Sequence, residues 1–357
     1  MKTTQVNEKP DFSGESIYVG IDVHKKQWNV SIMSALKEHK TFVQPPEPGV
    51  LGDYLKKHFP NASYYSVYEA GFCGFWIHDA LKREGIENAV VNPSDVPTTD
   101  KEKKQKNDRV DSRKLCKSLR DKSLTGIYVP TQEQLEDRGT IRLRRKLVSD
   151  IARCKNRIKG MLNFYGIKVP VEYDSAYWPK SFVTWLMEVE LTQPSGTFSL
   201  HTLVEELQVI GKLKKQVDRH LIQQGRQKYA TQVGLLRSIP GIGLIGALTF
   251  ITELSDMKRF RRLDDLCSYV GLVPNVYSSG ETQHTGHLTK RRNSYVQPIL
   301  IQCAWKAASK DPALLLAYQN WCKKMKANKA IVRVARKLLS RIRFVMVNQK
   351  KYELMKA

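Results

Sequence analysis

The sequence predicts an α/β domain at the N-terminus, then two long helices, and then a mainly helical C-terminal domain. Alternating apolar residues indicate strands in the first part of the chain, and helical spacing follows the later strands. A helical repeat of apolar residues runs from about residue 133 to 166 and again from about 200 to 230. From about residue 234 onward, helical segments alternate with glycine-containing turns.

The α/β domain is expected to cover residues 16–132, after a disordered N-terminus at 1–15. The segment SIYVGIDVHKKQWNVSIMS predicts two strands joined by a short turn, because its apolar residues alternate twice. YYSVYEAG (64–71) predicts a strand that ends at a glycine, and FWIHDALKREG (75–85) predicts a helix with a glycine C-cap. NAVVNPSDV predicts a further strand and turn, and a charged loop from residue 99 is expected to become a helix near Asp108.

The two long helices are expected to form an antiparallel coiled-coil linker over residues 133–233, joined by a loop that contains proline and aromatic residues. The third domain is expected at 234–345, followed by a tail at 346–357. Basic residues crowd the first long helix and the last helical segment. The arginines in these two regions that we expect to contact nucleic-acid phosphates are Arg144, Arg145, Arg153, Arg157, Arg333 and Arg336.

The charge balance indicates a polyanionic partner. The 357 residues carry a formal net charge of +24 and a pI near 9.7, and nucleic acid is the first candidate for such a chain. The six cysteines are scattered without a CxxC pair, which favours a reduced, cytoplasmic protein associated with the nucleoid over a zinc or redox protein. The polar N-terminus has no signal-peptide core, and no anchor indicates a membrane partner.

Four acidic residues occupy positions that suit a metal site. Asp22 and Glu69 each end a predicted strand, and Asp108 and Asp111 stand three residues apart, so they share one face of a helix. Taken singly, each is more often a turn former or a helix cap. Because clustered carboxylates persist mainly where a cation neutralises them, the ordered set indicates an RNase H-like nuclease core that binds Mg²⁺ or Mn²⁺.

The stretch RSIPGIGLIGALTF matches the spacing of a dinucleotide-binding loop, but a helix and not a strand is predicted before it, so we reject that interpretation. A helix–hairpin–helix fits better. Its turn, with Gly241 and Gly243, would offer backbone N–H groups to a phosphate without reading sequence. A purely structural helical hairpin is the alternative.

The polar stretch VYSSGETQHTGHLTKRRN (276–293) contains two serines and a basic run, Lys290, Arg291 and Arg292. A serine hydroxyl needs a base, a metal or a positive environment to act as a nucleophile, and no G-x-S-x-G elbow is present. Taken alone, the serines indicate only a loop. The basic neighbours suit a phosphate better than an acyl group.

In their order and spacing, the motifs GIDVHK, YEAG, KNDRVDSRKL, SIPGIG and YVGLVPNVYSSG…GHLTKRRN resemble those of the IS110 family of bacterial insertion-sequence transposases, which are bridge-RNA-guided recombinases. The likeness extends from about residue 16 to 345. It implies a RuvC-like domain in which Asp22, Glu69, Asp108 and Asp111 bind Mg²⁺, and a transposase domain in which Ser279 attacks a DNA phosphate to form a phosphoserine link. It also implies three partners: element-end and target DNA, a structured noncoding guide RNA, and further copies of the chain. Dimers would assemble to a tetramer, with the acids of one protomer completing a site with the serine of another.

One position departs from the family pattern. Where the family usually has Lys-x-Gly-Asn, this chain has Lys290, Arg291, Arg292 and Asn293. If the usual glycine has a positive φ, Arg292 would be strained there and activity would suffer. Two other functions stay open from the residues alone: a metal-dependent RuvC-like junction nuclease that uses water in place of Ser279, and a nucleic-acid-binding protein without enzymatic activity.

Overall fold

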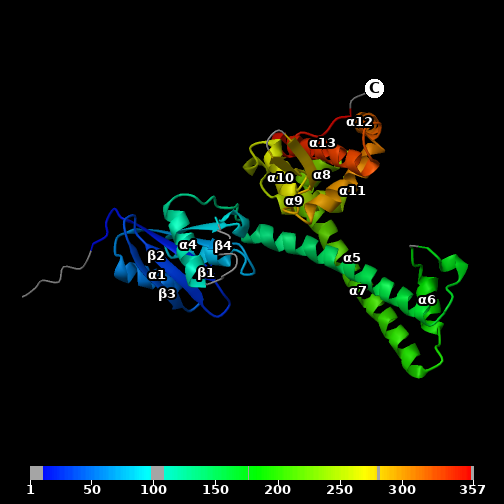
Figure 1. The fold of residues 1–357 in the computed structure, drawn as a ribbon. Coiled ribbons are helices and arrows are strands. Elements are labelled where there is room, and N and C mark those ends of the chain that lie inside the picture. Colours follow the sequence, from blue (N-terminus) through cyan, green and yellow to red (C-terminus); the bar gives the residue numbers. More distant parts are fainter. Residues whose placement is uncertain (1–10, 98–107, 176, 280–281, 355–357) are drawn as a thin grey trace, which may run out of the picture. The chain divides into compact units, whose positions relative to one another are not determined.

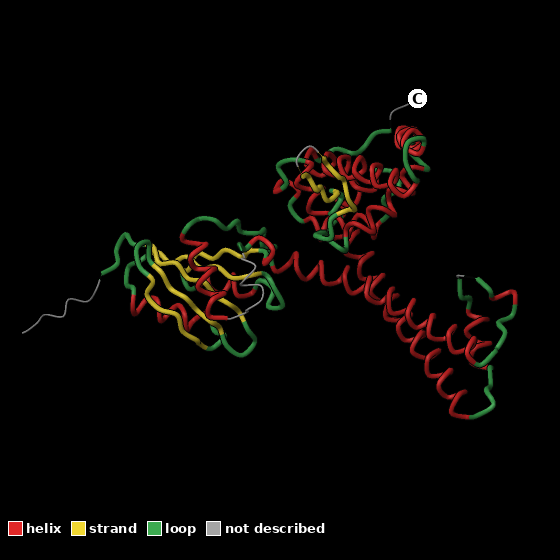
Figure 2. The backbone as a smooth tube through the Cα atoms, viewed as in Figure 1, coloured by secondary structure: helices red, strands yellow, loops and turns green. Residues whose placement is uncertain are grey.

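The structure, a computed structural model, describes residues 11–97, 108–175, 177–279 and 282–354 (Figure 1). The chain divides into two compact units, residues 1–129 and 130–357, and each unit has its own hydrophobic core. The first unit is mixed α/β and the second is mainly helical, which confirms the predicted fold class at that level (Figure 2).

The first unit is built on a five-stranded sheet with the order β3-β2-β1-β4-β5. β1, β2 and β3 form an antiparallel meander, whereas β4 and β5 run parallel to β1. The strands are β1 (Ser16–Val23), β2 (Trp28–Met33), β3 (Glu38–Gln44), β4 (Ser63–Glu69) and β5 (Ile86–Val91). β3 was not predicted, because this edge strand, EHKTFVQ, has few apolar residues to alternate.

Helices cover both faces of this sheet. α1 (Pro48–His58) and α2 (Trp76–Arg83) pack leucine and isoleucine side chains against the face that carries Ile17, Val19 and Ile21. α4 (Asp108–Arg120) packs across the opposite face, over β1 and β2. A short 3₁₀ turn, η1 (Pro93–Asp95), follows β5.

The second unit begins with α5 (Gln132–Phe164), which packs antiparallel against α7 (Pro194–Gln227). Ion pairs between Arg144 and Asp218 and between Arg157 and Glu206 fix this direction. Between the two helices, η2 (Val171–Tyr173) and α6 (Lys180–Glu188) replace the loop that the sequence predicted. α6 buries Phe182 against α5 and α7, so the connection is a packed cap on the helical hairpin.

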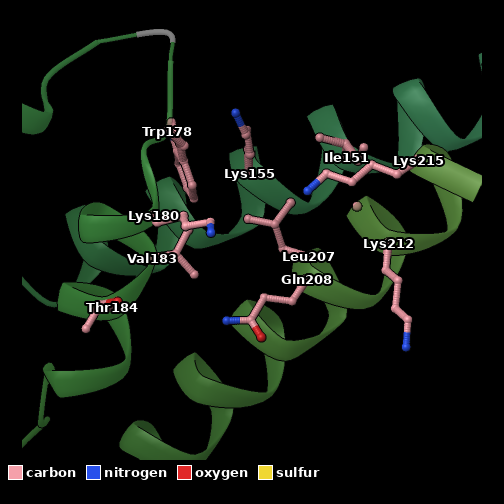
Figure 3. Close-up of a pocket in the computed structure, with 11 residues that line it drawn as sticks. Ile151, Lys155, Trp178, Lys180, Val183, Thr184, Leu207, Gln208, Lys212 and Lys215 are labelled. Atoms are coloured by element: carbon pink, nitrogen blue, oxygen red, sulfur yellow. The ribbon is translucent and has the colours of Figure 1, made fainter. Parts of the chain in front are cut away.

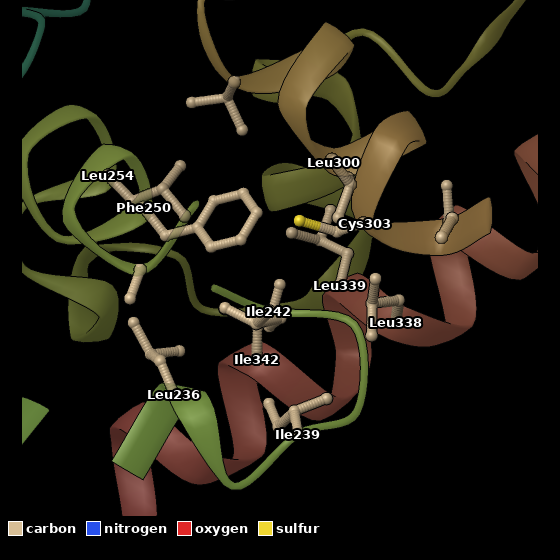
Figure 4. Close-up of a cluster of buried hydrophobic side chains, with 14 of the residues drawn as sticks. Leu236, Ile239, Ile242, Phe250, Leu254, Leu300, Cys303, Leu338, Leu339 and Ile342 are labelled. Carbon is tan, nitrogen blue, oxygen red and sulfur yellow. The ribbon is translucent and has the colours of Figure 1, made fainter. Parts of the chain in front are cut away.

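The C-terminal part of the second unit is a helical domain with a continuous apolar core. Figure 4 shows this core, where Phe250, Leu300 and Leu339 meet from three different helices. The helices are α8 (Ala230–Arg237), α9 (Leu244–Leu254), η3 (Met257–Arg259), α10 (Leu263–Val270), α11 (Val296–Ala308), α12 (Pro312–Cys322) and α13 (Ala327–Asn348). A two-stranded hairpin, β6 (Pro274–Ser279) and β7 (Thr282–Leu288), lies between α10 and α11.

None of the helices in the described part of the chain combines the length and the apolar composition that a membrane-spanning segment needs.

Candidate functional site

Asp22 and Glu69 lie side by side at the carboxyl ends of two neighbouring strands of the sheet. β1 and β4 are parallel neighbours whose last paired residues are Ile21 and Tyr68, and the two acids come next on each strand. Ile21 and Tyr68 point into the core under α1 and α2. Because side chains alternate along a strand, both acids project to the opposite face, which α4 covers.

His24 accompanies Asp22 at this edge, and the sequence analysis did not single it out. Its Nε2 atom lies 3.0 Å from Oδ2 of Asp22. The signal was present in GIDVHK, because residues two apart in an extended segment share a face. This contact restrains the Asp22 carboxylate, which is about one-fifth exposed.

α4 carries Asp111 over the same face, and two contacts set its position. The Ser112 hydroxyl is 2.9 Å from the Ser31 hydroxyl of β2. Gly20 of β1 allows the helix to approach closely, since a Cβ atom there would lie 2.1 Å from the Ser112 carbonyl oxygen. Asp111 is the residue before Ser112 and is half-buried.

Asp108 is the first residue of α4, but its side chain lies outside the described residues. Among the described side chains, no three acidic, histidine or cysteine residues gather into a metal-binding group. The structure therefore brings Asp22 and Glu69 to one edge and sets Asp111 on the helix above the same face, and it leaves the fourth predicted ligand undescribed.

Ser279 is the last residue of β6. Its backbone pairs with Thr282 of β7, so the stretch predicted as a loop is a hairpin at this point, while the Ser279 side chain lies outside the described residues. The far end of the hairpin is anchored where the Thr289 N–H donates to the Val273 carbonyl at 3.0 Å. Lys290 and Arg291 follow directly and are exposed.

The strain considered at Arg292 is absent. Arg292 is not among the described residues with a positive φ, so no glycine is needed at this position. Its guanidinium donates to Oε1 of Gln297, and the Gln297 amide donates to the Gly271 carbonyl at 2.7 Å. Gly271, which ends α10 with a φ of +84°, makes room for Arg292, because a Cβ atom at residue 271 would lie 2.3 Å from the Arg292 Cβ.

Asn293 joins this basic segment to a buried polar cluster. Its side-chain oxygen accepts from the N–H groups of Tyr295 and Val296 at 2.9 and 3.0 Å, which caps the start of α11. Its side-chain amide donates to Oε2 of Glu253 at 3.1 Å and to the Tyr269 hydroxyl at 3.3 Å. The Glu253 side chain is fully buried on α9.

α5 supplies the positive charges for this cluster. Arg142 donates to both Glu253 carboxylate oxygens at 2.7 and 2.9 Å, and Arg138 lies 3.8 Å from the same carboxylate. The guanidinium groups of Arg142 and Arg145 also lie 4.3 and 4.9 Å from the centre of the Tyr295 ring. The buried Glu253 carboxylate thus connects α5 and α9 with the segment that follows the β6–β7 hairpin, and the Tyr269 hydroxyl of α10 donates to the Glu253 backbone carbonyl at 3.3 Å. Sequence reasoning did not find Glu253, because a single acid near the end of a mostly apolar helix matches no motif.

Gly241 and Gly243 lie in the turn between α8 and α9, as predicted. Gly241 has a φ of +90°, and a Cβ atom on it would lie 2.6 Å from backbone atoms of Cys303 and Ala307. Packing against α11 therefore accounts for this glycine. Gly243 is exposed at the start of α9.

Most of the predicted phosphate-binding arginines have partners within the molecule. Arg144 pairs with Asp218, Arg153 with Asp150, Arg157 with Glu206 and Arg336 with Asp264. Arg145 donates to the Ser294 carbonyl, and Arg333 lies 5.9 Å from the centre of the Trp321 ring. Part of the formal positive charge of these helices is thus compensated internally.

Two family models match the chain. A transposase model of the IS110 DEDD type matches residues 19–167, and the model described as "Transposase IS116/IS110/IS902 family" matches residues 233–319. The chain is 28% identical to "Putative transposase y4qE" of Sinorhizobium fredii, over 81% of this chain and 71% of that protein. It is also 26% identical to "Transposase for insertion sequence element IS1111A" of Coxiella burnetii, over 62% of this chain and 59% of that protein.

The chain consists of an α/β unit with paired strand-end acids and a helical unit, and a transposase model matches each of them. These features define a transposase, an enzyme class that cuts and rejoins DNA. The chain belongs to the IS110 family of insertion-sequence transposases.

Proposed function

We propose that the protein cuts and rejoins DNA through a phosphoserine intermediate on Ser279, with a divalent metal ion held by Asp22, Glu69, Asp108 and Asp111. The observation that carries this proposal is the placement of Asp22 and Glu69 at adjacent parallel strand ends, on the face where α4 presents Asp111. The strand order β3-β2-β1-β4-β5 supports a RuvC-like assignment for this unit.

The donor set fits a hard cation, because carboxylate oxygens are the ligands that Mg²⁺ and Mn²⁺ prefer. When bound, the ion would supply Lewis-acid stabilisation of the charge that develops on the phosphate. The contact from His24 restrains one of the carboxylates, as a neighbouring hydrogen bond commonly does for a ligand.

Ser279 is the proposed nucleophile. Its oxygen forms a new P–O bond to a DNA phosphate, one P–O bond of the strand breaks, and the departing deoxyribose oxygen leaves as a hydroxyl that takes up the proton lost by the serine. Because the number of phosphoester bonds is unchanged, a second DNA hydroxyl can reverse the step on another strand without an energy source. Lys290 and Arg291, which follow the hairpin, suit the phosphate charge.

The family resemblance further supports a structured guide RNA that pairs with donor and target DNA, and an oligomer in which the acids of one protomer meet Ser279 of another. In the chain itself, the acids and Ser279 belong to different compact units.

The test is a covalent protein–DNA adduct that survives denaturation. The wild type is expected to form the adduct when it is incubated with element-end DNA, the guide RNA and Mg²⁺. Ser279→Ala and Asp22→Ala should form no adduct, and chelation of the metal should reduce adduct formation to background. Cleavage by the wild type without any adduct would sink the serine mechanism.

The placement of the acids and Ser279 in separate units also favours a second candidate, a RuvC-like junction nuclease in which water attacks the phosphate. In that case Ser279→Ala would cleave as fast as the wild type, and Asp22→Ala would not cleave. A protein that bound DNA but neither cut it nor formed an adduct would be a binding protein only.

A further inference from the structure

A hollow of about 560 Å³ lies between α5, α6 and α7, which carry neither Ser279 nor the four predicted metal ligands (Figure 3). Its volume falls within the range of small-ligand pockets. Ile151, Val183 and Leu207 give it an apolar lining, and Trp178 stands at its edge. We call it the hairpin pocket.

Four lysines line the hairpin pocket, and none of its eleven lining residues is acidic. They are Lys155, Lys180, Lys212 and Lys215. None of the four forms an ion pair with a described carboxylate, in contrast to Arg144 and Arg157 on the same helical hairpin. The pocket therefore carries four positive charges that no described acidic partner compensates, which calls for an anionic occupant.

Aromatic side chains beside the lysines further restrict the kind of ligand that fits the pocket. The Lys155 ammonium lies 4.9 Å from the centre of the Trp178 ring, so a cation and an aromatic face occur together. The neighbouring Tyr177 is 76% exposed. Trp178 itself is half-buried. Lysines beside aromatic rings match an occupant with both phosphates and planar bases, and a base can reach such a ring only when it is unstacked. Gln208 and Thr184 add polar groups that can meet a base edge or a ribose hydroxyl.

Part of the pocket lies outside the regions that the two family models match. One model ends at residue 167 and the other begins at residue 233, so Trp178, Lys180 and the α7 lysines lie outside both.

We propose that the hairpin pocket binds an unpaired nucleotide of a structured RNA, with a base on Trp178 or Tyr177 and phosphates on the four lysines. A folded RNA supplies unstacked bases in its loops, and it is these that single-strand recognition sites bind. The proposal rests on the RNA partner given under Proposed function, and it names where this chain holds that partner.

Gly211 offers a clean way to close the pocket. It lies on α7 among the lining residues, and a Cβ atom on it would meet nothing within 4 Å, so Gly211→Leu fills the hollow without a clash and improves helix propensity. Gly160 of α5 has the same open surroundings and does not line the pocket, so Gly160→Leu is the matched control.

The experiment measures fluorescence anisotropy with the full chain and a labelled single-stranded RNA of mixed sequence, its DNA counterpart and a DNA duplex. Gly211→Leu is expected to weaken RNA binding on the order of tenfold, as for the loss of one base–aromatic stack, while Gly160→Leu binds like the wild type. Lys180→Gln is expected to weaken RNA binding more than Lys57→Gln, which removes an equal charge from an exposed position on α1.

Three results would overturn the proposal: no RNA binding by the wild type, unchanged RNA binding by Gly211→Leu, or an equal loss for duplex DNA. An equal loss for RNA and single-stranded DNA would overturn the assignment to RNA. The adduct assay on Ser279 is read separately, so a wild type that forms no adduct but binds RNA through the hairpin pocket would contradict the serine mechanism alone.

Discussion

Gly20 lies on β1 two residues before Asp22, and the helix that carries Asp111 passes directly over it. Gly20→Ala is expected to destabilise the protein by about 2 kcal/mol or more, because the new methyl group overlaps backbone atoms of α4. The shift of α4 should also lower adduct formation. Urea unfolding checks the stability, with Gly160→Ala as the control, which should be neutral or stabilising because that site is open. Equal unfolding midpoints for Gly20→Ala and the wild type would contradict the packing argument.

Arg292 and Gly271 form a second matched pair at the residue scale. Arg292→Gly is expected to lower the melting temperature, because it removes the hydrogen bond to Gln297 and adds backbone freedom at a position without a positive φ. Gly271→Ala should lower the melting temperature further, because an alanine is strained at a φ of +84° and its methyl group would overlap Arg292. The double variant should recover part of that loss in a double-mutant cycle. A higher melting temperature for Arg292→Gly alone would restore the idea that Arg292 is strained.

Glu253 connects four elements, so its removal tests the packing of helices. Glu253→Ala leaves the nearly buried Arg138 and the partly exposed Arg142 without their carboxylate, and a loss of about 3–5 kcal/mol is expected. Glu206→Ala breaks the exposed pair with Arg157 on the same hairpin and should cost less than about 1 kcal/mol. Denaturant unfolding of both variants gives the comparison, and similar losses for the two would contradict a special role for the buried cluster.

Asp137 fixes α5 to the end of α7 and makes that contact sensitive to acid. Burial alone would raise the pKa of its carboxyl, but hydrogen bonds from Lys228 and Tyr229 outweigh it and hold the pKa below the ordinary value. A lowered folded-state pKa stabilises the fold above the unfolded pKa of about 4 and stops doing so as the pH falls through the folded value. The wild type should therefore exceed Asp137→Asn in unfolding free energy at pH 7, and the difference should shrink below about pH 4. A difference that grew on acidification would refute this.

At the scale of helices and strands, the sequence predicted the elements that have a regular spacing of apolar residues. The long helices α5 and α7, the strand β1 and the helix that begins at Asp108 follow from regular apolar spacing. The hairpin β6–β7 did not, because its sequences PNVYSS and TQHTGHL lack a regular alternation of apolar and polar residues. α6 was not predicted because prolines and aromatic residues in this segment indicated a loop, and their burial depends on contacts with α5 and α7. Asp22 and Glu69 were predicted as strand-end acids because each follows an alternating apolar run, whereas the parts that His24 and Glu253 play depend on tertiary contacts.

Across the whole molecule, net charge predicted the kind of partner but not where it binds. The formal charge of +24 indicated nucleic acid, and the family assignment agrees. Three of the six arginines predicted to contact phosphates, Arg144, Arg157 and Arg336, have acidic partners on neighbouring helices, and only the tertiary structure reveals such partners. The lysines of the hairpin pocket were not singled out from the sequence, since their common feature is a shared hollow between three helices.

The division into two units leads to a final prediction about assembly. The acids belong to residues 1–129 and Ser279 to residues 130–357, so a complete site can be built within one chain or between two. Asp111→Ala and Ser279→Ala should each form no adduct alone. If sites are shared between protomers, mixing the two variants pairs the intact acids of one with the intact serine of the other, and adduct formation should return at about half of the sites in each mixed dimer. The adduct should then form on the Asp111→Ala chain, which a size-tagged version of one variant would identify by gel mobility. With shared sites, every mixed dimer contains one site with intact acids and an intact serine. If the two tagged chains co-purify but the mixture forms no adduct, each chain must build its own site.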